Sequence, residues 1–457
     1  MEKIQHLYWR AGFGLSPREW KEMQGASLQQ AVDRLFREAG ADIPVEAPPP
    51  PSERPSRNMS EAQKKKLQGQ ERESLTEVRK DWLVRMSNPR YSAFMERMSL
   101  FWHGHFACQS FSGTLAFQQL RTIRKYAFGR FGDLVLAIAQ DPAMIRYLNN
   151  QQNHKDKPNE NFARELMELF TIGRGHYTEQ DIKEAARAFT GWSSNPQGIY
   201  TFRPQAHDYG AKTFFGKTGA FDGSDIINLI LERRETARFI TRKIYRYFVN
   251  EKVDEGLVDS LSRQFYDSEY DIGQLMRTIF ESGWFYEPHN IGVKIKSPLE
   301  LVAGIIRTLD VRFIDDKALI FLQRALGQVL YNPPNVAGWP GGKSWIDNAT
   351  LMMRLNLPGY LFQLSEFSFR VKDEPEAAQQ GKALRRIDAT LDLEPLMQIL
   401  EGVPRESYYD AFASFLLQAK PAFNPSLMAR YTAQGSNWDF ARTLAVRLMS
   451  LPEYQMC

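Results

Sequence analysis

The chain of 457 residues is long enough for one large domain or two ordinary ones, and its 43% hydrophobic and 25% charged content is typical of soluble globular proteins. Its 58 basic and 54 acidic side chains leave a formal net charge of +4. The excess is spread along the sequence, with Lys64, Lys65 and Lys66 as the only tight basic run, and this counts against nucleic-acid binding.

The cysteine content and the apolar runs exclude several further classes of protein. Two cysteines, Cys108 and Cys457, cannot build a disulfide framework or a four-thiolate zinc site. Residues 1–6 show no apolar stretch after a basic region, so we predict no secretory signal. No apolar run approaches the roughly 18 residues that a membrane span needs. We therefore expect a soluble, cytoplasmic protein with no membrane span.

Residues 1–43 are expected to form the N-terminal helical part of the core. Ser16-Pro17-Arg18-Glu19 reads as an N-cap serine, a proline at the first helical position and a glutamate at the third. Apolar residues recur with helical spacing over 28–36. Residues 44–75 begin with four prolines at 48–51 and continue with few apolar residues. We expect this stretch to be an exposed, mobile insertion.

Residues 76–357 are expected to form the main helical core with the candidate site. Helical spacing of apolar residues recurs over 91–102, 120–139, 162–170, 237–249 and 275–280. Helix-capping patterns begin at Thr178 and Ser297. The β-type runs 199–202 and 212–215 predict one small β-hairpin. With residues 358–457 as a peripheral C-terminal helical segment, the fold class is mainly α, a multi-helix globular domain.

Several short motifs then point to a family. In chain order they occupy residues 6–14, 101–106, 158–171, 188–192, 207–208, 294–300 and 333–342. Together they resemble the bacterial family catalogued as "domain of unknown function 1800", and the match is weakest over 44–74 and after 357. The resemblance implies a fold and a set of sites but no reaction. It also implies a partner, because in many bacterial genomes this family neighbours "domain of unknown function 1501", which looks like sulfatases and alkaline phosphatases.

His103 and His105 are the most ligand-like pair in the sequence. In a continuous helix their spacing turns them about 200° apart. If the helix over 91–102 ends at Gly104, both rings could turn to one side and share a metal. The alternative is that both pack or cap at a helix end, bonded to backbone groups.

Asn161, Glu165 and Glu168 fall on one narrow polar stripe of the helix predicted around 162–170. This stripe borders the apolar face, where a carboxylate is partly desolvated. Two such glutamates could bind a divalent ion or act as general acid and base. The alternative is an ordinary surface network in which Arg164 bridges Glu168.

Two loops carry further candidates. His207 and Asp208 are adjacent beside the predicted hairpin, which suits either a functional pair or a chance pairing in a polar loop. The segment 333–345 combines Trp339, Trp345 and glycines, a combination suited to a sugar or another planar ligand. The same residues also suit a rigid buried loop that joins helices.

Two functions follow from these candidates. The first is a metal-assisted hydrolase acting on a polar substrate such as a glycan or glycan ester, with zinc, manganese or calcium. Its predicted residues are: metal ligands His103, His105, Glu165 and Glu168; catalytic residues Glu165, Glu168, His207 and Asp208. The second is a non-catalytic binding or assembly partner of the sulfatase- or phosphatase-like protein that the resemblance implies.

Overall fold

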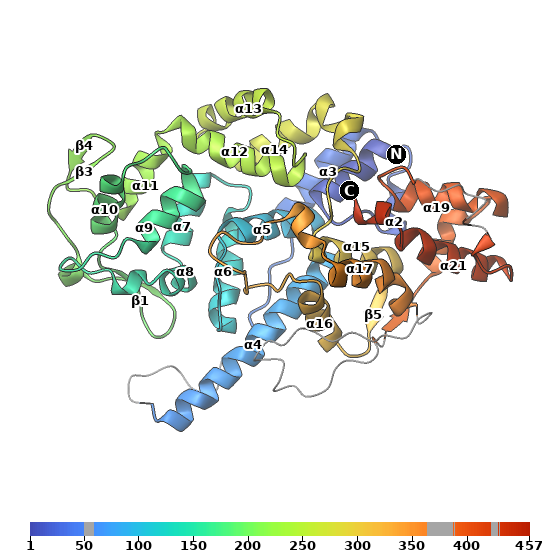
Figure 1. The fold of residues 1–457 in the computed structure, drawn as a ribbon, viewed down its shortest axis with the longest axis horizontal. Helices are drawn as coiled ribbons and strands as arrows, with labels where there is room; N and C mark the ends of the chain where they lie inside the picture. The colour runs from blue at the N-terminus through green and yellow to red at the C-terminus, as the bar shows by residue number, and fades with distance from the viewer. Residues whose placement is uncertain (50–58, 363–386, 388, 422–427, 429) are drawn as a thin grey trace.

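The structure is a computed structural model that describes residues 1–49, 59–362, 387, 389–421, 428 and 430–457. Within these residues the protein is mainly α-helical, as predicted (Figure 1). The α-helices are α1 (Glu2–Ala11), α2 (Pro17–Glu22), α3 (Leu28–Gly40), α4 (Glu61–Ser87), α5 (Ala93–His105), α6 (Gly113–Tyr126), α7 (Phe131–Ala139), α8 (Pro142–Tyr147), α9 (Asn161–Glu165), α10 (Glu179–Ala188), α11 (Gly223–Leu231), α12 (Arg234–Phe248), α13 (Glu255–Asp267), α14 (Ile272–Glu281), α15 (Pro298–Leu309), α16 (Lys317–Ala325), α17 (Asn348–Leu361), α18 (Glu394–Met397), α19 (Tyr408–Leu416) and α21 (Asn437–Met449). The shorter helices are η1 (Asn150–Gln152), the π-helix η2 (Leu166–Thr171), η3 (Pro204–Ala206), η4 (Gly283–Tyr286), η5 (Pro288–Asn290), η6 (Gly342–Trp345), η8 (Gln398–Leu400), η9 (Arg405–Ser407) and η10 (Pro452–Gln455).

Local capping sequences begin three of these helices where the sequence predicts them. Ser16, Thr178 and Ser297 each cap a helix with the side-chain oxygen, and the third helical residue of each helix bonds back to the cap. The reciprocal bonds satisfy backbone N–H groups that a helix start leaves without partners. These helix starts are therefore encoded locally.

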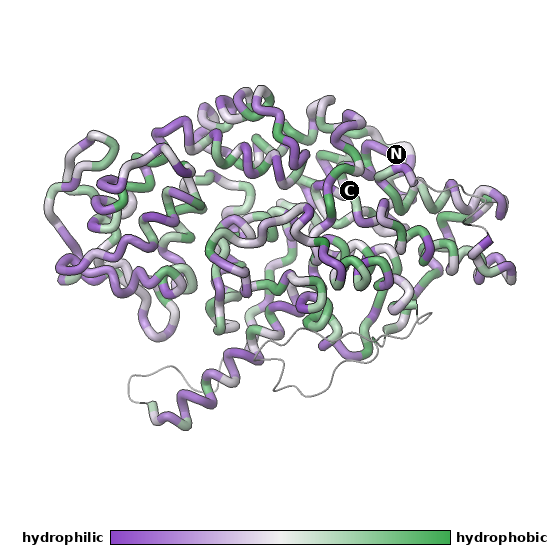
Figure 2. The backbone as a smooth tube through the Cα atoms, viewed as in Figure 1, coloured by the Kyte–Doolittle hydropathy of each residue, from purple (hydrophilic) through white to green (hydrophobic). Residues whose placement is uncertain are grey.

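The long helix α4 crosses the molecule and extends beyond it. Its C-terminal half packs against α6 and α15, whereas its N-terminal half projects from the body (Figure 1). The projecting half is hydrophilic (Figure 2) and begins with a capping box at Ser60. Its many Glu, Gln and Lys residues favour a helix. Part of the predicted insertion, 61–74, is thus helical, residues 50–58 lie outside the described ones, and the mobility of 44–75 stays a prediction.

The strands form small two-stranded sheets. β1 (Trp192–Ser194) pairs with β2 (Tyr200–Phe202), and β3 (Lys212–Phe214) pairs with β4 (Lys217–Gly219). The predicted strand segments are confirmed, but their pairing with each other is wrong, because each closes on a nearer neighbour. Gly198 (φ 73°) and Gly216 (φ 76°) supply the left-handed backbone at the two turns. A third pair joins the distant strands β5 (Val311–Phe313) and β6 (Ala389–Leu391).

One hydrophobic core runs through the centre of the molecule, where the tube in Figure 2 is mostly apolar. Helix α5 is buried on nearly all sides. Helices α19 and α21 lie together at one end (Figure 1). A β-bridge between Ile295 and Met456 joins the residues that follow α21 to the body. Among the residues described, no helix combines the length and apolarity that would let it cross a membrane.

Candidate functional site

Helix α5 continues through Gly104 to His105, so the predicted helix end at Gly104 is wrong. In a continuous helix, residues two apart project in widely different directions. His103 and His105 accordingly contact different parts of the core. The structure does not bring the two imidazoles together, and each has its own structural partners.

His103 holds the loop that follows α16. Its Nε2 accepts a hydrogen bond from the backbone N–H of Tyr331 at 3.2 Å, and its ring lies among Trp82, Tyr331 and Trp339. Burial, with Arg79 nearby, lowers the pKa of His103 to about 3, so the ring is neutral and Nε2 is free to accept. Tyr331 is buried with φ 57°, a conformation that is unfavourable for a tyrosine. The histidine thus stabilises a strained backbone position.

The loop 333–345 packs directly on the end of α5. A side chain at Gly338 (φ 79°) would place its Cβ 2.5 Å from the carbonyl oxygen of Gly104. Trp339 contacts His103, and Trp345 is buried. These contacts favour the rigid packing loop over the sugar site, because Gly338 and Trp345 are buried and the partly buried Trp339 packs on His103.

His105 lies beside η2, the segment that carries Glu168. Its Nε2 donates to the carbonyl oxygen of Phe170 at 3.0 Å, and Lys243 Nζ donates to its Nδ1 at 3.3 Å and to the carbonyl oxygen of Leu169 at 2.8 Å. Burial and Lys243 hold the pKa of His105 well below its usual value. Burial and Arg246 lower the pKa of Lys243 to about 8. The neutral imidazole of His105 therefore links the Phe170 carbonyl oxygen to the ammonium group of Lys243, which also bonds to the Leu169 carbonyl oxygen.

Glu165 and Glu168 lie where α9 changes into the π-helix η2. Glu168 accepts hydrogen bonds from Arg174 Nε at 2.6 Å and from the Tyr177 hydroxyl at 3.4 Å. Arg164 pairs with other carboxylates, so the predicted Arg164–Glu168 bridge is absent among the described ion pairs. Glu165 is half-buried, and its side chain makes no hydrogen bond or ion pair with a described residue. Burial, and then repulsion from Glu168, raise the pKa of Glu165.

His207 and Asp208 form a closed corner next to β3. His207 Nδ1 lies 2.8 Å from the carbonyl oxygen of Thr190, to which it donates. Asp208 accepts two hydrogen bonds from Arg187, at 2.7 and 3.3 Å, which hold its pKa below the usual value. Lys212 Nζ donates to the Asp208 carbonyl oxygen at 2.6 Å. Every polar group named here is engaged within the corner, so the pair stabilises the local fold.

The predicted site residues therefore lie in separate places. Glu165 and Glu168 share one helical segment, and His105 touches the backbone of that segment through Phe170. His103 and the His207–Asp208 pair lie elsewhere. In the described part of the chain, no three His, Cys, Asp or Glu side chains gather in an arrangement that could hold a metal ion.

A groove on the surface was not predicted from the sequence. It has a volume of about 1210 Å³ and lies between the projecting half of α4, the start of α6, α8 and the β1–β2 turn. Phe111 and Ile199, which are 60% and 59% exposed, both line it. Arg72 and Arg146 add positive charge, while Glu71 is occupied by bonds from Ser112 and Thr114 at the start of α6. The periodicity of the sequence carries no signal for these residues, because their exposure depends on how distant segments meet.

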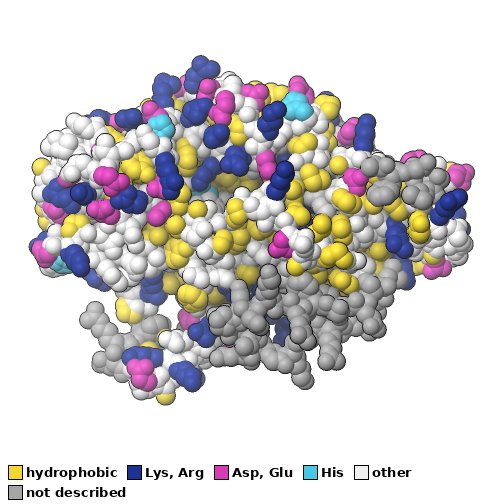
Figure 3. Space-filling view, in the orientation of Figure 1, with side chains coloured by type: hydrophobic (Ala, Val, Ile, Leu, Met, Phe, Trp, Pro, Cys, Tyr) yellow, Lys and Arg dark blue, Asp and Glu magenta, His cyan; other side chains and the backbone are white. Residues whose placement is uncertain are grey.

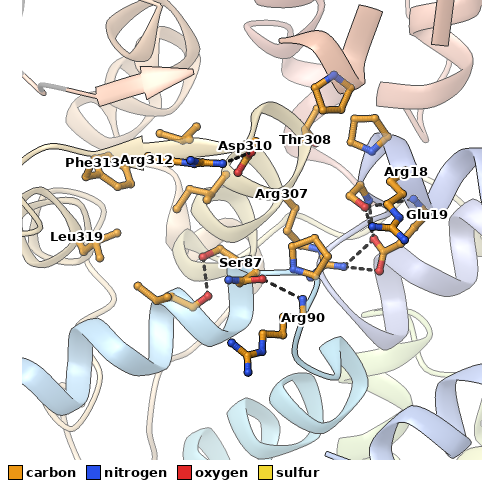
Figure 4. A pocket seen from close by; sticks show the side chains of 18 of the residues that line it. Arg18, Glu19, Ser87, Arg90, Arg307, Thr308, Asp310, Arg312, Phe313 and Leu319 are labelled. Carbon is orange, nitrogen blue, oxygen red and sulfur yellow. Dashed lines mark hydrogen bonds and ion pairs between the residues drawn. The ribbon is translucent and has the colours of Figure 1, made fainter. Parts of the chain in front are cut away.

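A second cleft of about 930 Å³ lies between α2, the end of α4, the end of α15 and β5 (Figure 4). Its floor holds the buried ion pair of Arg307 and Glu19, with both carboxylate oxygens 2.8 Å from Arg307 Nη2. Arg312 at the rim pairs with Asp310. Within each of these two pairs the charges neutralise each other.

Comparisons with known proteins identify a family for this chain. The model of the family described as "Protein of unknown function (DUF1800)" matches residues 6–456, which is nearly the whole chain. No curated protein and no solved structure matches the chain significantly.

Proposed function

The chain belongs to the DUF1800 family, and from that premise we propose that it is a non-catalytic binding or assembly partner of a sulfatase- or phosphatase-like protein. The observation that carries the proposal is the groove beside α4, with Phe111 and Ile199 exposed in it. Large apolar side chains that are exposed together in a concave surface favour protein–protein contact.

The engagement of the polar motif residues supports a binding role. His103, His105, His207, Asp208 and Glu168 each bond to a neighbouring group of the protein itself. A catalytic group needs a free position toward its substrate or a proton to exchange with it. Because these five side chains bond to other groups of the protein, we infer that they mainly stabilise the packing and connect helices.

The charge around the groove favours one kind of partner surface. Arg72 and Arg146 flank the apolar centre, and Arg146 donates only to the neutral groups of Ser194 and Asn195 among the described residues. A partner segment with an apolar side chain between carboxylates would complement this pattern. Elsewhere on the face shown in Figure 3, basic and acidic side chains are intermixed, which favours a protein partner over nucleic acid.

The test is binding to a sulfatase- or phosphatase-like protein of the "domain of unknown function 1501" family, measured by calorimetry with purified proteins. Phe111→Ser and Ile199→Ser are each expected to weaken the complex about tenfold or more, since central apolar contacts dominate interfaces. Ile314→Ser is the matched control, because Ile314 is 73% exposed but lies outside the groove. Equal affinities for all three variants and the original chain would contradict the proposed surface, and the absence of any complex would contradict the proposed partner.

Glu165 supports a second candidate, the metal-assisted hydrolase acting on a glycan or glycan ester. A half-buried carboxylate with a raised pKa, at the start of a π-helix, is typical of a general acid or a metal ligand. Glu168 would be the second carboxylate, and zinc, manganese or calcium the ion. Among the described residues, no third His, Cys, Asp or Glu side chain joins these two glutamates in an arrangement that could hold a metal ion. Water or substrate would therefore have to complete the coordination of the ion.

Elemental analysis of protein purified without a histidine tag separates the two functions. One equivalent of metal that is lost in Glu165→Gln and Glu168→Gln supports the hydrolase. Glu179→Gln is the control, because Glu179 is an exposed glutamate that pairs with Arg164 on the same surface. Metal-free protein that binds its partner supports the binding role.

A further inference from the structure

The interior beside α1 holds more positive than negative charge. Five cationic side chains are buried there: Arg10, Arg97, Lys294, Lys296 and Arg354. They come from α1, α5, the segment before α15, and α17. Among the described residues, Glu300 is the one carboxylate that forms an ion pair with any of them. Buried charge without a counter-charge is strongly unfavourable.

Glu300 is fully engaged and cannot balance the remaining cations. Its Oε1 lies 2.6 Å from Arg97 Nη1 and 3.1 Å from Lys294 Nζ, and its Oε2 accepts from the Ser297 N–H at 3.0 Å. Although burial opposes it, Arg97 and Lys294 lower the pKa of Glu300 to about 2. The carboxylate is therefore negative at any ordinary pH, and it neutralises one positive charge.

Two of the other cations bond to neutral groups only. Lys296 Nζ donates to the Tyr454 carbonyl oxygen at 2.7 Å and lies over the rings of Trp9 and Tyr454, at 3.5 and 3.9 Å from their centres. Arg354 donates to Gln455 Oε1 at 3.1 Å and to the Lys296 carbonyl oxygen. Carbonyls and aromatic faces stabilise a cation without neutralising it. Burial lowers the pKa of Lys296 to about 7 and that of Arg354 to about 10, so near pH 7 Arg354 stays charged and Lys296 is charged in part.

Of the five cations, Arg10 and Arg97 have the most unused donors, and Arg354 has one, its Nη1. Arg10 Nη2 donates to the Asn290 carbonyl oxygen at 2.6 Å, but its Nε and Nη1 are buried without a partner. Arg97 Nε and Nη2 are likewise buried without a partner. Burial, with Arg97 nearby, lowers the pKa of Arg10, whereas Cys457, Glu300 and Glu251 act in the opposite direction. Buried donors in native proteins are almost always bonded, so missing partners indicate a bound water or ion.

We propose that a small anion of carboxylate or halide size binds between Arg10 and Arg97. The excess of positive charge favours a negative group, and the four unused nitrogen atoms of Arg10 and Arg97 supply its hydrogen bonds. The enclosed position limits the anion to a small one. This site is separate from the surface groove and does not depend on the function proposed above.

A carboxylate could reach this position from two sources. One is a small anion from solution. The other is a carboxylate group at Cys457, whose backbone N–H and carbonyl oxygen bond to the backbone of Lys294 at 2.8 and 3.0 Å. Both sources supply the same chemistry to the same two arginines, and the experiment distinguishes them.

The experiment measures thermal unfolding in sodium formate, sodium chloride and sodium gluconate at constant ionic strength. Gluconate is the reference, since it is too bulky for an enclosed site. We expect the midpoint to rise by roughly 2 °C or more in formate or chloride, because a ligand that binds only the folded state stabilises it. Arg10→Met should abolish the rise. Arg10 makes no ion pair with a described residue, so this variant removes a cation without exposing a carboxylate.

Arg307→Met is the matched control. Arg307 is also a buried arginine, but its carboxylate, Glu19, is present (Figure 4). This variant should lower the midpoint and keep the anion-dependent rise. If Arg10→Met fails to fold, Lys296→Met replaces it, because Lys296 also lacks an ion pair among the described residues and its removal should weaken the anion response.

A chain extended by Gly-Ser after Cys457 separates the two sources. A rise in the original chain that Arg10→Met removes indicates an anion from solution. A rise that appears only in the extended chain, and again disappears with Arg10→Met, indicates a carboxylate of the polypeptide. If neither chain distinguishes formate or chloride from gluconate, the proposed site does not exist.

Discussion

Asp141 is a buried carboxylate that should make the protein less stable as pH rises. It caps α8, where its Oδ1 accepts from the N–H groups of Ala143 and Met144 at 3.0 and 3.3 Å. Burial raises its pKa from 3.8 to about 7. The contribution of a group with a raised pKa is fully present below the unfolded value of 3.8 and is lost as pH rises through about 7.

The substitution Asp141→Asn isolates this effect. The difference between 3.8 and about 7 corresponds to about 4 kcal/mol, at 1.36 kcal/mol per pKa unit. Asparagine is as good a helix N-cap as aspartate, so both capping hydrogen bonds are retained. The variant should therefore match the original chain near pH 4 and exceed its free energy of unfolding by up to about 4 kcal/mol at pH 8.

Urea unfolding of both proteins between pH 4 and pH 8 measures this difference. Asp222→Asn is the control, because Asp222 is an exposed N-cap of α11 with the same two types of backbone bond. Its effect should not change over this range. If Asp141→Asn changes the free energy of unfolding by the same amount at every pH, the aspartate is not protonated in the folded protein and the reasoning is wrong.

Three further substitutions test the contacts of the candidate site by urea unfolding. Gly338→Ala should lower the free energy of unfolding by more than about 2 kcal/mol, because it combines a left-handed backbone with a steric clash. The control Gly327→Ala, with φ 84° and open space around it, should lower it by about 1 kcal/mol, and equal losses would refute the close packing on α5. His103→Phe should cost about 1–3 kcal/mol by leaving the Tyr331 N–H buried without an acceptor, and a neutral effect would show that this bond is unimportant. The lowered pKa of Lys243 makes stability rise from about pH 8 to pH 10.5. Lys243→Met should remove that rise of about 3 kcal/mol, and an unchanged profile would contradict the burial of its ammonium group.

Helix starts and the fold class were predictable because their causes are local. The capping boxes at Ser16, Thr178 and Ser297 involve residues three apart, and helical apolar spacing reports a buried face without knowledge of its partner. The polar stripe that carries Glu165 was predicted on the same basis. Its π-helical continuation was not, because a π turn is set by the packing of the surrounding core.

The mainly α fold, the DUF1800 family and the residues of its distinctive motifs could all be predicted from the order of the residues. The contacts that those residues make depend on the folded chain. Helix α5 continues past Gly104, and its end packs against the loop at Gly338 and the backbone of Tyr331. No spacing rule reports such contacts, because the residues lie more than two hundred positions apart in the sequence. The exposure of Phe111 and the unused donors of Arg10 arise in the same way, from segments that meet only in the folded chain.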